Sequence, residues 1–430
     1  MSAASHPAPP LVALSRRQLA AVALGNGFEF YDFTVYGFFA VPIGRTFFPA
    51  LSPWTSLLLS VAAFGVGFGA RPLGSVFFGV YADRRGPRPA MLLTVLLMAL
   101  GSLTVAALPG YAVLGPAAPI LMVAGRLVQG FALGGEIGPS TTFLLEAARP
   151  GQRARAVSWQ ITMHGVAVLA AGAFGIAATT LLPPEARDTW GWRLPMLLGL
   201  GILPVGLMIR ATLPAAAAVP RARPAPSALL RPVLAHPGRL GAAILVICSG
   251  SVPFYIVSYL TSYGITVMKL PAADALLAAV GSGLATLAIA PLGGRLADRW
   301  GRRPALLASR LGMAAIAVPA FAWLAGSGGT PALLAVSAAL AALNALGAPA
   351  GLCMILESLP AGVRSTGLAI VYAVGVSLFG GLSQFAATAL TALTGDPLSP
   401  ADLLAAASLA GAAAAFRLPA ARDAAVSRRP

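Results

Sequence analysis

Charged residues are what this 430-residue sequence has least of. Only 10% of its residues are Asp, Glu, Lys or Arg, whereas 58% are hydrophobic. A soluble domain usually carries about 25% charged residues. So little polar surface cannot cover so much apolar sequence in water, and the composition therefore predicts a chain that folds in a lipid bilayer.

Cysteine and the motifs of nucleotide or metal chemistry are also missing. Cys248 and Cys353 lie in apolar runs, and their number and spacing fit neither a disulfide framework nor a metal site. The glycines of Gly65–Gly69 resemble a nucleotide loop, but an apolar run with no preceding strand surrounds them, where small residues favour helix packing. With no Walker loop and no nucleophile–base set, the sequence predicts no cofactor, no metal, no catalytic residue and no enzyme.

Basic residues outnumber acidic ones by 29 to 13, yet their distribution argues against nucleic-acid binding. All but Lys269 are arginines, and they lie in short hydrophilic breaks between apolar runs instead of on one face of a domain. This pattern is typical of the charges that orient membrane spans. The predicted partner of this surface is the lipid bilayer.

Twelve apolar segments reach the length of about 20 residues that a helix needs to cross a bilayer. The predicted fold class is therefore an all-α membrane protein with twelve transmembrane helices. A tail rich in alanine and proline at 1–15, which is predicted to be disordered, and a short tail at 419–430 flank them, and the first lacks the features of a signal peptide. The predicted spans are 18–41, 55–80, 89–109, 117–146, 156–181, 192–213, 239–262, 273–294, 304–325, 330–356, 365–392 and 399–418.

The basic residues predict the orientation of these spans. With the N-terminus placed inside, 22 of the 29 fall on the inner side and four on the outer side, and the other three (Arg71, Arg126 and Arg310) fall within spans. Because loops rich in arginine stay in the cytoplasm, both termini are predicted to be cytoplasmic.

An internal repeat divides the chain in two. The run Gly79–Pro89 recurs as Gly294–Pro304, which places Asp83 and Asp298 215 residues apart. The sequence therefore predicts six-helix halves at 16–213 and 238–418, joined by a linker at 214–237. Transporters built from such repeats bind substrate near the midplane between the halves.

The repeated loops are candidate gates on the cytoplasmic side. An aspartate at a helix end can pair with arginines or accept hydrogen bonds from the N–H groups of a neighbouring helix, and Gly86 and Gly301 permit tight turns. Loops that only anchor topology would need arginines alone, so we favour a gating role. The candidates are Gly79, Asp83, Arg84, Gly86, Arg88, Gly294, Asp298, Arg299, Gly301 and Arg303, with the repeated pairs Glu146/Arg153 and Glu357/Arg364.

These motifs resemble the major facilitator superfamily, whose signature is the Gly-x3-Ala-Asp-Arg-x-Gly-x-Arg loop. The segments Gly25–Phe33, Arg71–Gly74 and Gly125–Glu136, with Trp190–Arg193, are similar to the metabolite–proton symporter family. The resemblance runs from about residue 14 to 418, and it departs from the family at Pro87 and Ala154. It implies a secondary transporter that works by alternating access.

Segments of the second half resemble the citrate and tricarballylate branch of that family. They are Phe254-Tyr255 through Tyr263-Gly264, Phe379–Gly381 and Leu393–Pro400. The resemblance implies proton-coupled uptake of a small di- or tricarboxylate by a functional monomer. Symport of α-ketoglutarate, shikimate or a zwitterion such as proline or betaine stays open, as does proton-driven efflux. A channel or a membrane enzyme, from another class, is disfavoured, because a channel does not need two halves that rock and an enzyme would need a catalytic set that the sequence lacks.

Three acidic residues, Glu29, Asp32 and Glu136, lie within predicted spans. An ionisable group at bilayer depth costs several kcal/mol, so it usually faces a cavity and has a partner. Glu29 and Asp32 are three residues apart and share a helix face, where their proximity favours protonation of one. We expect a proton-coupling role for at least one of them; the alternative is a carboxylate that braces a neighbouring helix.

Arg126 has two open interpretations. It can pair with Glu29 or Asp32, or it can bind a substrate carboxylate in a bidentate manner. His164 is a candidate proton relay, although a histidine satisfied by a backbone carbonyl fits equally well. The remaining substrate-binding candidates are the polar residues Asn26, Tyr31, Tyr36, Gln129, Gln160, Tyr255, Tyr259, Tyr372 and Gln384.

Overall fold

The computed structural model describes residues 27–28, 30–49, 52–85, 87–134, 137–146, 148–149, 151–201, 203–204, 236–326, 328–359 and 363–419. We call the described residues up to 204 the N-terminal half and those from 236 onward the C-terminal half. Throughout these ranges the regular elements are helices. The two tails and nearly all of the predicted linker lie outside the described residues.

The N-terminal half begins with a helical stretch over residues 30–38. It continues through α2 (Ala40–Phe47), α3 (Pro53–Gly69), α4 (Arg71–Arg85), α5 (Pro87–Ala107), α6 (Tyr111–Leu114), α7 (Ala117–Leu133), α8 (Ile137–Glu146), α9 (Arg153–Thr180) and α10 (Pro184–Ala186), and closes with the π-helical turn η1 (Arg187–Gly191), α11 (Arg193–Leu197) and the 3-10 turn η2 (Leu198–Gly201).

The C-terminal half consists mainly of longer helices. They are α14 (Pro237–Thr266), α15 (Ala272–Trp300), α16 (Arg302–Gly326), α17 (Gly329–Ser358), α18 (Arg364–Gly375), the π-helical turn η4 (Val376–Gly380), α19 (Ser383–Thr394) and α20 (Ser399–Ala415).

Seven helices of the described chain are long and apolar enough to cross a membrane, and shorter apolar helices cover 92–107, 117–133 and 399–415. Each of the twelve predicted spans overlaps a helix, although the first, the fourth and the sixth are described only in part. The all-α membrane fold is therefore confirmed.

Local sequence signals explain several helix ends. The Ser52 side chain accepts a hydrogen bond from the Thr55 backbone N–H at 3.1 Å, and Pro53 opens α3, as expected for a helix N-terminus. Gly301, between α15 and α16, has a φ of 98°, which side-chain-bearing residues rarely adopt. The turn predicted at this glycine is confirmed.

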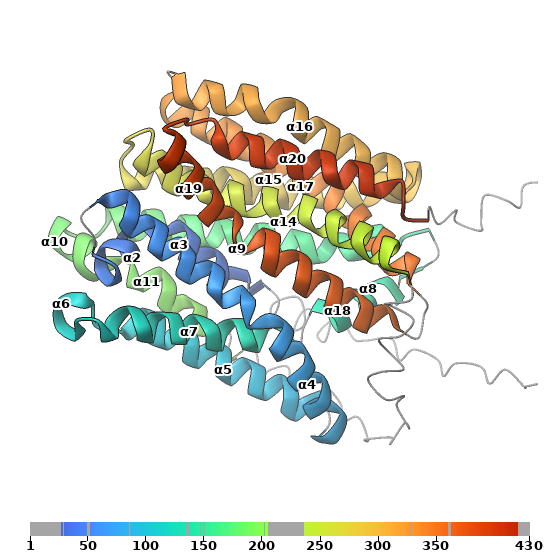
Figure 1. Cartoon of the computed structure of the whole chain (residues 1–430), viewed down its shortest axis with the longest axis horizontal. Coiled ribbons are helices and arrows are strands. Elements are labelled where there is room, and N and C mark those ends of the chain that lie inside the picture. Colours follow the sequence, from blue (N-terminus) through green and yellow to red (C-terminus); the bar gives the residue numbers. More distant parts are fainter. Residues whose placement is uncertain are drawn as a thin grey trace, which may run out of the picture.

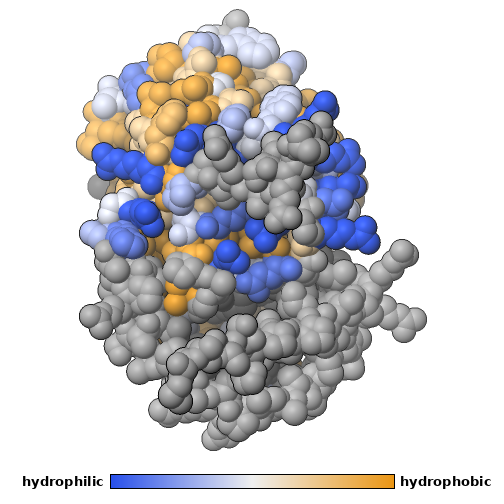
Figure 2. Space-filling view, turned by 90° about the vertical axis from the view of Figure 1, so that its right-hand side faces the viewer, coloured by the Kyte–Doolittle hydropathy of each residue, from blue (hydrophilic) through white to orange (hydrophobic). Residues whose placement is uncertain are grey.

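The two halves lie side by side, with their helices roughly along the long axis (Figure 1). The N-terminal half (blue to green) forms the lower part of this view, and the C-terminal half (yellow to red) the upper part. Helix α9 runs along the boundary and packs against α15 of the other half. At one end of the bundle, where α8 ends and α9 begins, hydrophilic side chains gather between apolar ones (Figure 2).

Glycines permit the close contact of α9 with α15. A Cβ atom on Gly165 would lie 2.6 Å from the backbone nitrogen of Leu287, and one on Gly283 would lie 2.5 Å from that of Leu169. Real Cβ atoms do not approach so closely, so any side chain at either position must push the helices apart. Helix packing through small residues is typical of membrane proteins.

This contact predicts a large difference between two glycine substitutions. Gly283→Ala should lower the stability of the detergent-purified protein by about 1–3 kcal/mol, because the added methyl overpacks backbone against backbone. Gly241→Ala in α14 is the matched control, since a Cβ there meets nothing within 4 Å. Thermal unfolding of both variants measures the difference; equal unfolding temperatures would show that the crossing tolerates a side chain.

Candidate functional site

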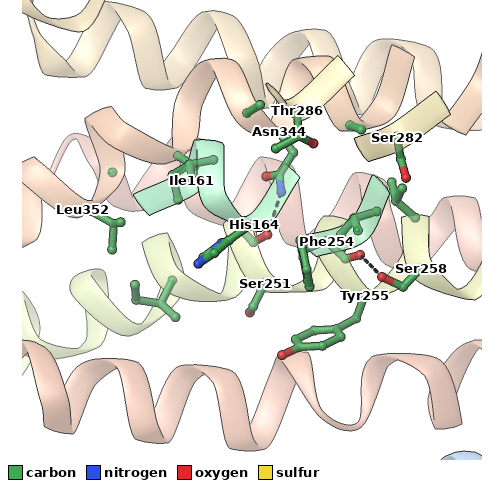
Figure 3. A pocket seen from close by; sticks show the side chains of 18 of the residues that line it. Ile161, His164, Ser251, Phe254, Tyr255, Ser258, Ser282, Thr286, Asn344 and Leu352 are labelled. Atoms are coloured by element: carbon green, nitrogen blue, oxygen red, sulfur yellow. Dashed lines mark hydrogen bonds between the residues drawn. The ribbon is translucent and has the colours of Figure 1, made fainter. Parts of the chain in front are cut away.

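A cavity lies between the two halves (Figure 3). Phe30, Ile161, His164 and Val168 form its wall on the N-terminal side, and the last three come from α9. Residues of α14, α15, α16, α17 and α18 form the rest of the wall. The cavity therefore opens at the position where two repeated halves meet, which is where the sequence predicts a substrate site.

The wall of the cavity carries one basic side chain. Arg310 is the only Asp, Glu, Lys or Arg among the described residues that line it. Its Nη1 donates to Asn344 Oδ1 at 2.8 Å, and Asn344 Nδ2 in turn donates to the Gly250 carbonyl at 3.2 Å. The other polar groups on the wall are neutral hydroxyls and an imidazole, from Ser251, Tyr255, Ser258, Ser282, Thr286, Tyr372 and His164.

A second buried polar cluster lies inside the N-terminal half. Gln129 Nε2 donates to Asp32 Oδ2 at 2.5 Å and to Ser102 Oγ at 3.0 Å, while Gln129 Oε1 accepts from Arg126 Nη1 at 2.7 Å. Asp32, Gln129 and Arg126 are 5%, 1% and 0% exposed. The amide of Gln129 thus stands between the carboxylate and the guanidinium, which do not pair directly among the described contacts.

Aromatic rings enclose the Arg126 guanidinium. Its central carbon lies 4.5 Å from the ring centroid of Phe33, 4.4 Å from that of Tyr36 and 5.2 Å from that of Phe64. Its Nε and Nη2 have no hydrogen-bond partner in the described structure. Cation–π attraction stabilises such a buried cation. Arg126 does not line this cavity, and its described link to Asp32 runs through Gln129 instead of the direct pairing that the sequence suggested.

The other candidate residues divide between the cavity and the packed interior. His164, Tyr255 and Tyr372 line the cavity. Tyr31 and Tyr36 donate their hydroxyls to the carbonyls of Pro195 and Ser60, at 2.6 and 3.2 Å. Their roles in transport stay predictions.

Three further candidates lie within the helix packing. Gln160 Oε1 accepts from Thr141 at 2.9 Å, and Gln384 Nε2 donates to the Tyr255 carbonyl at 3.3 Å. Tyr259 is fully buried in a hydrophobic cluster. Asn26, Glu29 and Glu136 lie outside the described residues.

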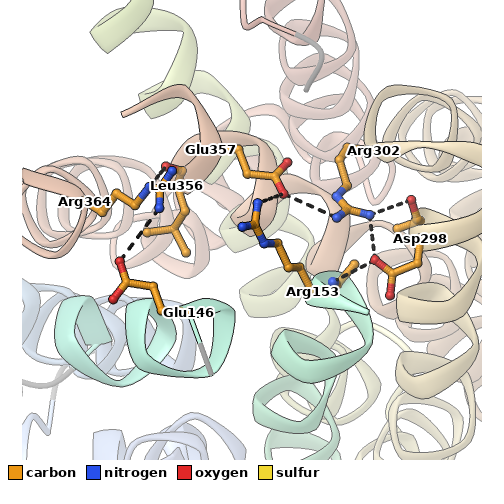
Figure 4. A network of polar contacts seen from close by, with 9 residues as sticks. Glu146, Arg153, Asp298, Arg302, Leu356, Glu357 and Arg364 are labelled. Atoms are coloured by element: carbon orange, nitrogen blue, oxygen red, sulfur yellow. Dashed lines mark hydrogen bonds and ion pairs between the residues drawn. The ribbon is translucent and has the colours of Figure 1, made fainter. Parts of the chain in front are cut away.

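Ion pairs join the two halves at the end of the bundle shown in Figure 2 (Figure 4). Arg302 pairs with Asp298 at 2.7 Å and with Glu357 at 3.3 Å, within the C-terminal half. Arg153, at the start of α9, pairs with Glu357 at 3.7 Å, and Arg364 pairs with Glu146, at the end of α8, at 3.8 Å. We call these six residues the ion-pair network.

The network exchanges partners between the two copies of the repeat. Glu146 and Arg153 are the first copy of the repeated pair, and Glu357 and Arg364 are the second. Each glutamate pairs with the arginine of the other copy. Both of these pairs therefore cross from one half to the other and join the halves at this end of the bundle.

Asp298 also caps a helix of the opposite half. Its carboxylate oxygens accept hydrogen bonds from the backbone N–H groups of Ala154 and Arg155, at 3.0 and 2.9 Å, in the first turn of α9. A carboxylate at a helix N-terminus satisfies unpaired donors and interacts favourably with the helix dipole. Both contacts predicted for this aspartate, with an arginine and with backbone N–H groups, are present. Because the donors are backbone groups, alanine at position 154 does not prevent them.

The other residues predicted to act as gates on the cytoplasmic side lie in different environments. A Cβ on Gly294 would lie 2.8 Å from the Ala154 carbonyl, so this glycine allows α15 to approach α9. Arg303 donates to the carbonyls of Ala415 and Leu418, at 3.1 and 2.7 Å, and Arg299 is exposed. Gly86 lies outside the described residues, and side chains are not described for Gly79, Asp83, Arg84 and Arg88, which lie in α4 and α5.

Sequence reasoning gave Arg310 no role, although it placed this arginine within a span. Its position in a span could have marked Arg310 as a candidate, because burying a charge at bilayer depth is costly for an arginine as it is for Asp32. Asn344 was recognisable only as a polar residue in a span.

Two helical halves, a cavity between them and ion pairs that join them at one end are features of the transporters of the major facilitator superfamily. The sequence pattern of the family described as "Sugar (and other) transporter" matches residues 19–215 and 234–421. The chain belongs to this family, and it is a multi-pass membrane transporter and not an enzyme.

Individual relatives agree with this assignment. The chain is 34% identical to a citrate-proton symporter of Klebsiella pneumoniae, over 91% of this chain and 88% of the relative. It is 32% identical to the α-ketoglutarate permease of Escherichia coli, over 88% and 89% of the two chains. A D-xylose-proton symporter has the same fold, with a TM-score of 0.76, 18% identity, and coverage of 94% of this chain and 98% of the other.

Proposed function

We propose that this protein is a proton-coupled symporter that takes up a small organic anion, a citrate-like di- or tricarboxylate, by alternating access. Its membrane is the bacterial inner membrane, and the end that carries the ion-pair network faces the cytoplasm, as do both termini. The protein acts as a monomer. The substrate and protons are its partners.

The charge of the cavity carries this proposal. Arg310 gives the wall a positive charge, and no acidic residue is among the described residues that line it. Hydroxyl groups of the same cavity wall can donate to the many oxygens of a carboxylate-rich ligand. A zwitterion such as betaine would find no acidic counter-charge for its ammonium group among these described residues. The names of the citrate-proton symporter and the α-ketoglutarate permease point to the same substrate class.

The surroundings of Asp32 support proton coupling. This carboxylate is buried, and its described partners are a neutral amide and, through that amide, a hydroxyl and Arg126. When Asp32 is protonated, the three aromatic rings around Arg126 still stabilise its positive charge. The neutral carboxylic acid is therefore compatible with a buried guanidinium nearby. A carboxylate held in this way is suited to binding and releasing a proton.

The ion-pair network supports alternating access. The pairs between the halves and the cap on α9 can form only when the two halves meet at this end. They would separate when the cavity opens toward the cytoplasm and form again when it opens to the outside. Packed interfaces of this kind are bistable and change by rocking of rigid bodies.

Uptake into proteoliposomes tests the proposal. We expect purified protein to accumulate radiolabelled citrate when the proton concentration is higher outside, and to lose this accumulation when a protonophore collapses the gradient. Tricarballylate should compete, and betaine should not. Accumulation of α-ketoglutarate but not of citrate would assign α-ketoglutarate as the substrate. Uptake that does not depend on the proton gradient would refute proton coupling.

A further inference from the structure

We propose that Arg310 is the residue of the C-terminal half that binds a carboxylate of the substrate, and that Asn344 holds its guanidinium in place for this contact. His164 lies on the opposite wall of the same cavity and supplies the second polar contact. The inference rests on the proposed transport of an organic anion and identifies where that anion binds.

The first argument is the incomplete pairing of a buried cation. The Arg310 side chain is 1% exposed, and its hydrogen bond to Asn344 uses Nη1 alone. Nε has no partner, and no ion pair of Arg310 occurs in the part of the chain that the structure describes. Burying a charge without a counter-charge is expensive. No acidic side chain of the described residues therefore balances the charge of Arg310, and an anionic ligand would do so.

A comparison with Arg126 sharpens this argument. Both guanidinium groups are fully buried inside the helix bundle. Arg126 has three aromatic rings around it and, through Gln129, an indirect link to a carboxylate. Arg310 has neither, yet it lines the cavity and Arg126 does not. Both guanidinium groups keep donors without a hydrogen-bond partner, but Arg126 is covered by aromatic rings, whereas Arg310 lies in the wall of the cavity, where a ligand can supply the missing partner.

Two glycines lie beside one edge of the Arg310 guanidinium. A Cβ on Gly250 would lie 3.5 Å from Nη2 of Arg310, and one on Gly347 would lie 3.6 Å from the same atom. Gly250 also forms part of the cavity wall. With Asn344 on Nη1, the edge formed by Nε and Nη2 is the one that a planar carboxylate can bind with two parallel hydrogen bonds.

The facing wall explains why the ligand should carry more than one anionic or polar group. His164 belongs to α9 of the N-terminal half, and its Nε2 has no hydrogen-bond partner among the described residues. Figure 3 shows its ring at the cavity beside Asn344 and Ser251. A di- or tricarboxylate that binds Arg310 at one end and His164 at the other contacts both halves at once. Such a ligand favours the conformation in which the halves close around it.

Equilibrium binding to the full-length protein tests the inference. Isothermal titration calorimetry in detergent would use citrate, tricarballylate and α-ketoglutarate as ligands. Arg310→Gln should weaken the binding of whichever ligand the wild type binds by about 10- to 100-fold, the range expected for hydrogen bonds to a charged group. Arg310→Lys, which keeps the charge but not the planar fork, should weaken binding less.

Two further variants complete the design. Arg295→Gln in α15 removes the same charge from an exposed position of the same half and should bind like the wild type. Gly250→Val keeps Arg310 but places a side chain beside its Nη2, and it should weaken binding as well. The second variant decides the matter if Arg310→Gln does not fold, as judged by gel filtration and thermal unfolding.

The outcomes separate the two proposals. Binding by the wild type together with undiminished affinity in folded Arg310→Gln, or in Gly250→Val if the former does not fold, overturns the role of Arg310 and leaves anion transport standing. No binding of any of the three ligands by folded wild type overturns both. Weaker binding in the Arg310 and Gly250 variants, with wild-type affinity in the Arg295 control, supports the inference.

Discussion

Asp32→Asn should abolish proton-driven accumulation of substrate and leave exchange of substrate across the membrane measurable. Asparagine has nearly the same shape as aspartate, and its side-chain oxygen can still accept from Gln129. It cannot bind and release a proton. Exchange needs only the loaded carrier to move in both directions, whereas accumulation needs the proton to be taken up on one side and released on the other.

Proteoliposome assays distinguish these two modes. Wild type and Asp32→Asn would be compared for gradient-driven uptake and, with substrate on both sides, for counterflow. Asp402→Asn, in the exposed first turn of α20, is the control for the loss of a carboxylate. If Asp32→Asn accumulates substrate as the wild type does, the proton is carried elsewhere, and Glu29 and Glu136 become the residues to test.

Asp298→Asn should shift the protein toward the conformation in which the ion-pair end is open. The substitution removes the charge that pairs with Arg302 and weakens the cap on Ala154 and Arg155. Charged hydrogen bonds contribute about 1.5–3 kcal/mol each, so the open population should rise by roughly tenfold or more. The cap acts across the two halves, and its loss therefore favours their separation directly.

Cys353 is a natural reporter of this shift. It is fully buried in α17, one helical turn before Glu357. In a Cys248→Ser background, we expect a maleimide to modify Cys353 about tenfold faster in Asp298→Asn than in the parent, in line with the shift in population. Asp402→Asn should leave the rate unchanged, and retained citrate binding would show that the variant is folded. An unaltered rate of modification would mean that Asp298 does not hold this end closed.

The sequence was sufficient for the fold because membrane spans follow from composition alone. Each apolar run of the predicted length overlaps a helix, and the turn at Gly301 has the positive φ that its glycine indicated. The repeat also identified Asp298 and the glutamate–arginine pairs of the network. These features depend on local sequence or on symmetry between the halves, and both are visible in a single chain.

The partners within the site depend on helix rotation and packing, which the sequence does not contain. The repeat suggested that Glu146 and Arg153 belong together, but the structure pairs each with the other half. Tyr255 and Tyr259 lie one turn apart on α14, yet the first lines the cavity and the second is buried in the core. Likewise, nothing local distinguishes Arg126, which is enclosed by aromatic rings, from Arg310, which lines the cavity.

Helix α9 links the cavity to the ion-pair end as a single rod. It is continuous from Arg153 to Thr180 and contains no proline, in contrast to α14, α15, α16 and α17. His164 lies ten residues after Ala154, or about 15 Å along the axis. A tilt of about 5° around His164 would move the first turn by about 1 Å, enough to stretch the bonds to Asp298 beyond hydrogen-bonding distance. A tilt of this helix at the cavity would thereby reach the far end of the protein through the rigid rod, without any chain of intervening side chains.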